Sequence, residues 1–372
     1  MGRGRGARFG VGRVRSRHGR GPQTTIATAI AVLVVAACAG SPAATSDPWS
    51  AGSTAPPPAA GTTTPVPLDD VDQALRELAP NVGFLAALVT PQGTCEAVHE
   101  IAPSTPRPTG SQFKLYVLGA LADQITAGRT SWDQTLTVED RAKSAGNGEG
   151  SLQAAAPGTT VSVEDAATKM ISISDNTATD MLIGLVGRDT VQAKNDAWSE
   201  SADANVPFLT TREVLLLHYV PGLADAYLAT APDERVAFLK ASVDPRPVTD
   251  IGLGLSADPR HIERIEWFAS PDDICRAFAG LQQLARAPGL APLTNVLSRE
   301  TGTIGLDATR WPTVWFKGGS EPGVLTLGWL ATNDRGDTFV VQAMISNPDA
   351  ALGSDSITRL VGISRKAFER LR

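Results

Sequence analysis

Hydrophobic periodicity changes twice along this chain, and that change limits the possible folds more than any other feature. Residues 83–102 show two short strand patterns around a Pro-Gln-Gly turn, and helical patterns dominate from 111 to about 227. Strand patterns return at Thr313–Lys317, Val324–Thr332 and Thr338–Ser346, with turns expected at Gly318–Gly323 and Asn333–Asp337. Amphipathic helices are expected at Leu68–Leu78 and Asp355–Leu371. We therefore predict one sheet built from both ends of this region, with a mostly helical lobe inserted over about residues 104–265.

Charge is distributed unevenly between the N-terminal segment and the rest of the chain. The formal net charge of −6 divides into +7 over residues 1–37, which hold seven Arg and no acid, and −13 over the remainder. An acidic body of this kind repels a polyphosphate backbone. The sequence therefore predicts no nucleic-acid partner.

The basic segment has the features of an export signal. Thr24 to Ala37 is uncharged and apolar but shorter than the roughly 20 residues that a membrane-spanning helix needs. The run Val35-Ala36-Ala37-Cys38 resembles the lipobox of bacterial lipoproteins, in which the signal is cut before a Cys that is then diacylated. The alternative is a plain secretory signal in which Cys38 is incidental.

Three regions follow from these observations. Residues 1–37 are predicted to be a lipoprotein signal peptide, and 38–67 a lipidated Cys38 followed by a Pro-, Ala- and Thr-rich tether too poor in apolar residues to fold. Residues 68–372 form the folded domain. The predicted location is export, with a lipid anchor on the outer face of the cell membrane as the membrane contact.

Two cysteines remain after lipidation of Cys38, namely Cys95 and Cys275. An oxidising compartment permits them to pair as a disulfide. The alternative is two small buried thiols.

Several kinds of chemistry have no support in the sequence. His99, His218 and His261 belong to no metal-ligand spacing, so we expect no metal and no cofactor, and each reads better as a surface or packed side chain. No GxSxG elbow and no Walker loop occurs. An α/β-hydrolase and a P-loop enzyme are therefore disfavoured.

The most informative segment is Thr109-Gly110-Ser111-Gln112-Phe113-Lys114. The expected helix from Phe113 to Ile125 is apolar nearly all round, and Lys114 is its one cation. Three-residue spacing places Lys114 on the same helix face as Ser111. Burial lowers the pKa of a lysine, so a neutral amine becomes available as a base for the Ser111 hydroxyl.

Two further segments carry polar groups at expected element ends. Ser174-Asp175-Asn176 lies at a helix junction where short polar side chains can enter a cleft, and Thr177-x-x-Asp180 resembles a capping box; pure capping is the alternative reading. Trp315-Phe316-Lys317-Gly318-Gly319-Ser320 is a strand that ends in a cation and two glycines, which let a substrate approach the strand edge. An ordinary strand and turn is the alternative there.

In this order and spacing, the three segments resemble the SxxK, SDN and KTG signature of serine β-lactamases and penicillin-binding proteins. The middle motif makes the chain similar to class A. The runs GSQFKLYVLGALADQI, EWFASPDDICRAFAGLQ and WFKGGSEPGVLTLGWL are more specifically similar to an actinobacterial subgroup that includes a clavulanate-cluster protein and mycobacterial lipoproteins. The resemblance implies a β-lactamase-like α/β (α+β) fold, with an antiparallel sheet from both termini and an inserted helical lobe.

The resemblance also implies a role for each site residue. Ser111 is the acylated nucleophile, Lys114 its base and Ser174 a relay of the proton to the leaving nitrogen. Asn176 would hydrogen-bond the substrate amide, and Lys317 would hold the cleft electrostatically. The oxyanion hole falls on the backbone N–H groups of Ser111 and Ser320, and Gly318 and Gly319 line the substrate edge.

Two positions depart from the family pattern. Class A enzymes hydrolyse the acyl-enzyme with a Glu in an ExxLN loop, but the one Glu between Thr177 and Arg212 is Glu200, which does not fit. Gly318 replaces a Thr or Ser that contacts the substrate carboxylate, with Ser320 as a possible substitute. The expected function is a serine hydrolase of β-lactams or related amides and esters; the alternatives are a slowly deacylating penicillin-binding or sensing lipoprotein and a peptidoglycan DD-peptidase.

Overall fold

The computed structural model describes residues 68–145, 151–251 and 257–371 of the 372-residue chain. The predicted signal, Cys38 and the tether lie outside the described residues, as do residues 146–150, 252–256 and 372. Within the described ranges, no helix combines the length and apolar character needed to cross a membrane.

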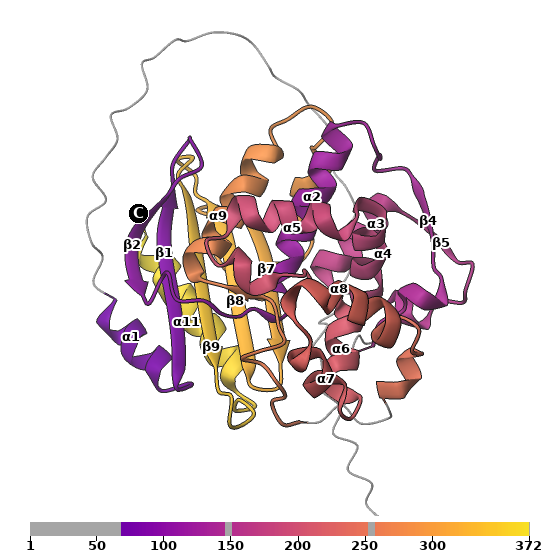
Figure 1. Ribbon diagram of the computed structural model, residues 1–372. Helices are drawn as coiled ribbons and strands as arrows, with labels where there is room; N and C mark the ends of the chain where they lie inside the picture. The colour runs from indigo at the N-terminus through magenta and orange to yellow at the C-terminus, as the bar shows by residue number, and fades with distance from the viewer. Residues whose placement is uncertain (1–67, 146–150, 252–256, 372) are drawn as a thin grey trace, which may run out of the picture. The chain divides into compact units, whose positions relative to one another are not determined.

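A five-stranded antiparallel sheet forms the centre of the domain, in the order β2-β1-β9-β8-β7 (Figure 1). Its strands are β1 Asn81–Val89, β2 Cys95–Ile101, β7 Thr313–Glu321, β8 Val324–Thr332 and β9 Thr338–Ser346. Strands from the two ends of the domain meet where β1 pairs with β9, from Asn81 opposite Ser346 to Val89 opposite Thr338. The predicted sheet from both termini is confirmed.

The sheet has a separate hydrophobic core on each face. Along β1, Leu85 and Ala87 point into the core of the helical lobe, whereas Phe84 and Ala86 point toward the terminal helices. Those helices are α1 Asp69–Arg76 and α11 Ser356–Arg370, which pack together and cover one face (Figure 1). Because both faces are covered, β1, β8 and β9 read as nearly continuous apolar runs rather than alternating ones.

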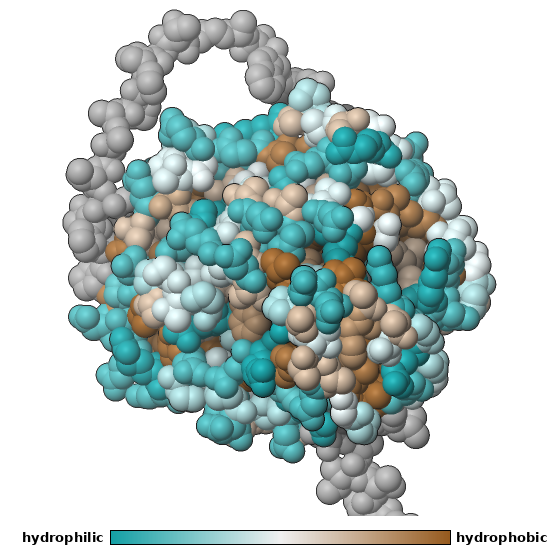
Figure 2. Space-filling model, in the orientation of Figure 1, coloured by the Kyte–Doolittle hydropathy of each residue, from teal (hydrophilic) through white to brown (hydrophobic). Residues whose placement is uncertain are grey.

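The helical lobe covers the other face of the sheet (Figure 1). Its helices are α2 Lys114–Thr126, α3 Val163–Ser172, α4 Asn176–Val186, α5 Arg188–Trp198, α6 Thr211–Tyr219, α7 Leu223–Ala229, α8 Arg235–Phe238, α9 Pro271–Leu284 and α10 Pro292–Ser298. Short strands pair as β3 Arg107–Pro108 with β6 Phe268–Ala269, and as β4 Thr135–Thr137 with β5 Thr160–Ser162. Single turns of helix are η1 Gly110–Phe113, η2 Asp140–Ala142, η3 Leu152–Ala154, η4 Ala202–Asn205, η5 Pro232–Glu234, η6 Leu239–Val243 and η7 Val248–Ile251. On the face that Figure 2 shows, hydrophobic residues are scattered among hydrophilic ones.

The predicted turn over Gly318–Gly323 is wrong for most of its length. Strand β7 continues to Glu321, and Gly318 and Gly319 pair with Leu327 and Thr326 of β8. Glycine weakens a strand in general, but here the strand needs it because another backbone segment approaches closely at this point. The two glycines therefore belong to the sheet edge at the site.

Cys95 and Cys275 form a disulfide that joins β2 to α9 across 180 residues of sequence. Of the two alternatives that the sequence left open, the structure shows the pairing. Helix α9 lies against β1, β2 and β9, so the bridge fastens the helical lobe to the sheet near the edge opposite β7.

Candidate active site

Ser111 lies in the 3₁₀ turn η1, immediately before α2 begins at Lys114. The turn opens at Gly110, whose φ of +49° favours glycine. A Cβ at Gly110 would also lie only 2.8 Å from the backbone nitrogen of Ser320. The local sequence Thr-Gly-Ser thus lets the nucleophile segment turn directly against strand β7.

Lys114 is fully buried at the start of α2. Its Nζ donates hydrogen bonds to the Ser174 carbonyl at 2.6 Å, to Ser174 Oγ at 3.1 Å and to Asn176 Oδ1 at 2.7 Å. Burial lowers its pKa to about 7, partly offset by the charges of Asp175 and Asp180. Among the described residues, these are the hydrogen bonds of Nζ, so Lys114 faces the Ser174 segment and is not bonded to Ser111 Oγ.

The Ser174-Asp175-Asn176 segment combines capping with site chemistry. Asp175 is the N-cap of α4, where its carboxylate accepts from the amides of Ala178 at 3.0 Å and Leu152 at 2.7 Å. Ser174 has a φ of +57°, which turns its hydroxyl and carbonyl toward Lys114. Both interpretations of the tripeptide are therefore correct, for different residues. Asp175 caps the helix, whereas Ser174 and Asn176 contact Lys114 in the site.

Lys317 reaches the same hydroxyl from strand β7. Its Nζ lies 3.0 Å from Ser174 Oγ and 2.7 Å from the Gly318 carbonyl, and the residue is 2% exposed. Burial, together with the charge of Lys114, lowers the pKa of Lys317 well below its usual value. The Ser174 hydroxyl thus lies between Lys114 and Lys317, two lysines whose pKa values are both lowered.

Backbone amides from η1 and β7 meet beside Ser111. A Cβ at Gly319 would lie 2.1 Å from the Thr109 carbonyl oxygen and 2.6 Å from the Ser111 nitrogen. Thr326 Oγ1 donates to the same Thr109 carbonyl at 2.7 Å and fixes the approach. This contact brings the amides of Ser111 and Ser320 to neighbouring positions, as an oxyanion hole requires.

Gln112 links the turn η1 to strands β7 and β9 through buried hydrogen bonds. Its side-chain amide donates to the Lys317 carbonyl at 2.9 Å, and it exchanges two hydrogen bonds with Gln342 at 3.0 and 2.8 Å. All of these groups are buried. No motif in the sequence predicts this role for Gln112, whose position next to Ser111 was the only indication.

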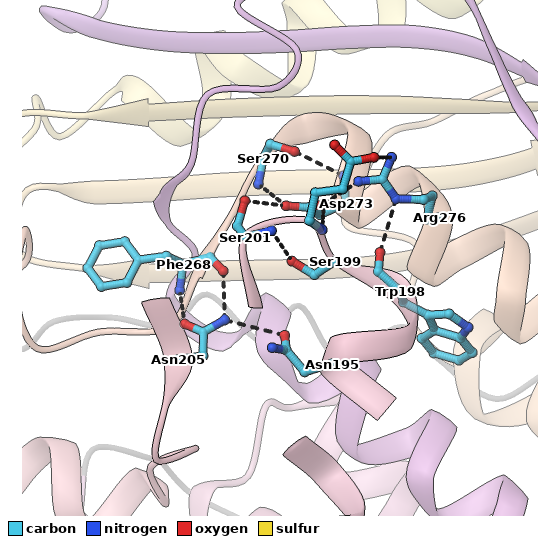
Figure 3. A network of polar contacts seen from close by, with 10 residues as sticks. Asn195, Trp198, Ser199, Ser201, Asn205, Phe268, Ser270, Asp273 and Arg276 are labelled. Atoms are coloured by element: carbon cyan, nitrogen blue, oxygen red, sulfur yellow. Dashed lines mark hydrogen bonds and ion pairs between the residues drawn. The ribbon is translucent and has the colours of Figure 1, made fainter. Parts of the chain in front are cut away.

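A polar network joins the end of α5, the turn η4, strand β6 and the start of α9, and it holds the segment that supports Thr109 (Figure 3). Asp273 accepts from Ser270 N at 2.9 Å, Ser201 Oγ at 2.6 Å and Glu200 N at 2.8 Å. Asn205 binds both backbone groups of Phe268 in β6, at 2.7 and 2.9 Å. The adjacent Trp267 carbonyl accepts from Thr109 N at 2.9 Å, so the network reaches the nucleophile turn.

The same network shows where Glu200 lies. Its side chain is 81% exposed and pairs with Arg276 at 3.3 Å, away from Lys114 and Ser174. The expectation that Glu200 does not take the place of the ExxLN Glu agrees with this position.

Asp180 is a buried carboxylate near the site, and its partners differ from those that the sequence pattern predicts. It was expected to complete a capping box with Thr177, but Asp175 caps α4 instead, and Asp180 accepts from Thr211 N at 2.8 Å and Arg212 N at 2.9 Å. Burial raises its pKa to about 7, against the hydrogen bonds that lower it. Its function is to hold the start of α6 against α4. Within the described residues no group of three or more His, Cys, Asp and Glu is placed to hold a metal ion.

The Ser-x-x-Lys turn, the second lysine on the sheet edge and the Ser174 segment thus come together in one site. Residues 72–231 match the family model described as the Beta-lactamase enzyme family. No curated protein gives a significant match.

Solved structures share the fold. PBP-A is 19% identical with a TM-score of 0.54, covering 83% of this chain and 100% of its own. A β-lactamase from Sphaerobacter thermophilus is 21% identical, with a TM-score of 0.53 and coverages of 82% and 97%. One from Chitinophaga pinensis is 16% identical, with a TM-score of 0.55 and coverages of 81% and 97%. The resemblance to class A-like serine β-lactamases and penicillin-binding proteins is confirmed at the level of fold; the actinobacterial subgroup stays a prediction.

Proposed function

We propose that this protein is a serine hydrolase that acts through an acyl-Ser111 intermediate on β-lactams or related amides and esters. The observation that carries the proposal is Lys114, a fully buried lysine with a pKa lowered to about 7, three residues from Ser111 and bonded to Ser174. A lysine with a purely structural role does not require a lowered pKa. A general base does benefit, because a pKa near 7 leaves part of the amine neutral at neutral pH.

The site residues supply each proton transfer of acylation. Neutral Lys114 keeps two N–H donors for the Ser174 carbonyl and Asn176, and its lone pair takes the proton of Ser111 as Oγ attacks the substrate carbonyl carbon. The resulting oxyanion accepts from the amides of Ser111 and Ser320. When the C–N bond breaks, Ser174 Oγ protonates the leaving nitrogen and takes back a proton from Lys114. Lys317 stabilises the transient negative charge on Ser174.

The same geometry favours slow deacylation, which makes a penicillin-binding or sensing role the second candidate. Among the described residues, the carboxylates that act on Lys114 electrostatically are Asp175 and Asp180, and both are bonded to backbone amides. Neither is placed to activate a water on the acyl-enzyme. One solved structure with this fold is a PBP-A mutant as an acyl-enzyme complex with penicillin G, at 18% identity and a TM-score of 0.51.

Intact-mass spectrometry over time tests the proposal and separates the candidates. Wild-type protein treated with penicillin G should gain the mass of one β-lactam, and Ser111→Ala should not. An adduct that forms and disappears with product release supports a hydrolase, whereas a stoichiometric, lasting adduct supports the penicillin-binding role. Release of D-Ala from a D-Ala-D-Ala peptide would instead support a DD-peptidase. No adduct from penicillin G, a cephalosporin or an activated ester would refute acylation at Ser111.

We also propose that residues 1–37 direct export and that Cys38 carries a lipid anchor for the domain. The proposal is supported by the lipobox-like run at Val35–Cys38 and by the disulfide between Cys95 and Cys275, since disulfides persist in oxidising compartments. Wild-type protein should incorporate labelled fatty acid and sediment with membranes, and Cys38→Ser should do neither. Equal labelling of the two proteins would contradict the anchor.

A further inference from the structure

The chain between Leu209 and Trp267, which includes α6, α7 and α8, is fastened together at its two ends. Trp267 Nε1 donates to the Leu209 carbonyl at 2.9 Å. One residue further along, Phe268 N donates to Asn205 Oδ1 at 2.7 Å, and Asn205 Nδ2 donates to the Phe268 carbonyl at 2.9 Å (Figure 3). These bonds join residues 205–209 to residues 267–268, a pairing that we call the neck.

Phe113, the last residue of the nucleophile turn η1, packs its ring against the neck. The ring stacks on that of Trp267, with centroids 3.6 Å apart and planes at 15°, and it meets the Phe208 ring edge-on at 5.8 Å. All three rings are buried. Packed aromatic rings combine a large buried area with a preferred geometry, so the neck fixes where Phe113 lies.

Trp267 also holds the other end of the nucleophile segment, through its backbone. Its carbonyl accepts from Thr109 N at 2.9 Å and from Thr109 Oγ1 at 3.0 Å, and Thr109 is fully buried. Ser111 lies two residues after Thr109 and two residues before Phe113. A single residue, Trp267, therefore contacts the chain on both sides of the nucleophile.

The neck reaches the base Lys114 by two routes. Lys114 directly follows Phe113, and its Nζ lies 5.9 Å from the centre of the Phe113 ring. Helix α6 begins at Thr211, two residues beyond the neck, and Thr211 Oγ1 donates to the Asn176 carbonyl at 3.1 Å. Asn176 Oδ1 in turn accepts from Lys114 Nζ at 2.7 Å. Nucleophile and base are therefore held from the same place in the fold.

We propose that Trp267 is a positioning residue that holds Ser111 and Lys114 in the mutual alignment that acylation needs. The proposal rests on the proposed function for its catalytic meaning, whereas the contacts that carry it do not. Transfer of the Ser111 proton and attack by its Oγ both depend on alignment, and a misplacement of about 1 Å costs about 10²-fold in rate. Loss of the Trp267 ring should therefore lower the limiting rate of acylation far more than the binding of the β-lactam.

Acylation by penicillin G in two Trp267 variants tests this role. Trp267→Leu removes both the ring and its N–H, whereas Trp267→Phe keeps a ring against Phe113. We expect the limiting rate at saturating penicillin G to fall about 10²-fold in Trp267→Leu and less than about tenfold in Trp267→Phe. The half-saturating concentration should stay within about threefold of wild type in both, because uniform binding is unchanged. If Trp267→Leu does not fold, Trp267→Met makes the same test, since its flexible side chain fills the space without a ring.

Trp311→Leu is the matched control. Trp311 is a buried tryptophan in the core on the other face of the sheet, where it packs edge-on against Phe339 and Phe368. Both Leu substitutions remove a buried indole and should lower the free energy of unfolding in urea. Trp311→Leu should nevertheless keep the wild-type limiting rate under conditions in which it is folded. Equal limiting rates in Trp267→Leu and Trp311→Leu, or no recovery of rate in Trp267→Phe, would overturn the positioning role.

NMR follows the same contacts without any reaction. The ¹³Cα signals of Ser111 and Lys114, which report backbone conformation, should shift or broaden in Trp267→Leu, because η1 loses a fixed partner and exchanges between conformations. Trp311→Leu should leave both signals unchanged. Signals that respond equally to the two substitutions, or to neither, would overturn the proposal. If the wild type forms no adduct with penicillin G, the proposed function fails, while these signals still decide whether Trp267 positions Ser111 and Lys114.

Discussion

Lys114 Nζ donates a 2.6 Å hydrogen bond to the backbone carbonyl of Ser174. The carbonyl faces the lysine because Ser174 adopts a left-handed backbone conformation, with φ at +57°. A carbonyl oxygen always accepts, so one proton of Lys114 is committed whether the amine is charged or neutral. The contact thus orients the amine and leaves its remaining positions for proton transfer with Ser174 Oγ.

The first prediction concerns the pH dependence of acylation. Because the pKa of Lys114 is lowered to about 7, its neutral form grows as pH rises through 7, and the rate of acylation should rise with it between pH 5 and 8. Lys114→Arg cannot lose its proton in this range and should lower the rate by about 10²-fold or more. Stopped-flow or quenched intact-mass measurements give the rate. The exposed Lys366→Arg serves as control, and a flat profile in the wild type would contradict the base role.

A second prediction separates strain from chemistry at Ser174. Ser174→Gly and Ser174→Ala both remove the hydroxyl between Lys114 and Lys317, so both should slow acylation by an amide-type substrate. Glycine tolerates a φ of +57° and alanine does not, which favours Ser174→Gly in folding stability by about 1 kcal/mol. Urea unfolding at pH 7 measures the difference. Equal stability of the two variants would show that this conformation costs nothing.

Local sequence was sufficient for most elements of the sheet. Strands β8 and β9 begin and end at the predicted residues, because both are apolar runs bounded by turn-forming Gly, Asn and Asp. Strand β7 was predicted too short because Gly318 and Gly319 look like a turn. What keeps them in the strand is the close approach of η1, a contact about 200 residues apart in sequence that no local pattern contains.

The site was predictable in its residues but not in their contacts. Spacing placed Lys114 beside Ser111, yet the partners of the amine come from Ser174 and Asn176, about 60 residues later. The Thr177–Asp180 pattern predicts a local cap, whereas the Asp180 carboxylate accepts from the amides of Thr211 and Arg212 at the start of α6. Motifs identify chemical groups, and tertiary packing decides which of them meet.

The third prediction tests the backbone approach at Gly319. A Cβ there would lie 2.1 Å from the Thr109 carbonyl and 2.6 Å from the Ser111 nitrogen, and neither backbone atom can rotate away. Gly319→Ala should therefore push η1 from β7 and lower acylation by about 10²–10³-fold, the loss expected for one oxyanion donor. Gly184→Ala in α4 is the matched control, because no atom lies within 4 Å of its Cβ position. It should keep the rate and add about 0.5–1 kcal/mol of stability. Equal rates in the two variants would contradict a role for this contact.

The last prediction concerns Asp273, the centre of the network in Figure 3. Burial would raise its pKa, but hydrogen bonds from Ser201, Ser270 and Glu200 and the charge of Arg276 lower it below the usual value. A carboxylate with a lowered folded-state pKa stabilises the protein above about pH 4, and this contribution is lost as pH falls through the folded value.

Asp273→Asn should therefore unfold with about 3 kcal/mol less free energy than wild type at pH 7, since it leaves Arg276 without its buried partner. The difference should shrink as the pH falls below about 4 and through the lowered pKa of the Asp273 carboxylate. Asp272→Asn, one residue away and half-buried, is the control and should change stability by about 0.5 kcal/mol. Denaturant unfolding at pH 7, 4 and 2 measures all three proteins. A loss in Asp273→Asn that is the same at every pH would mean that packing, and not the charge, carries the effect.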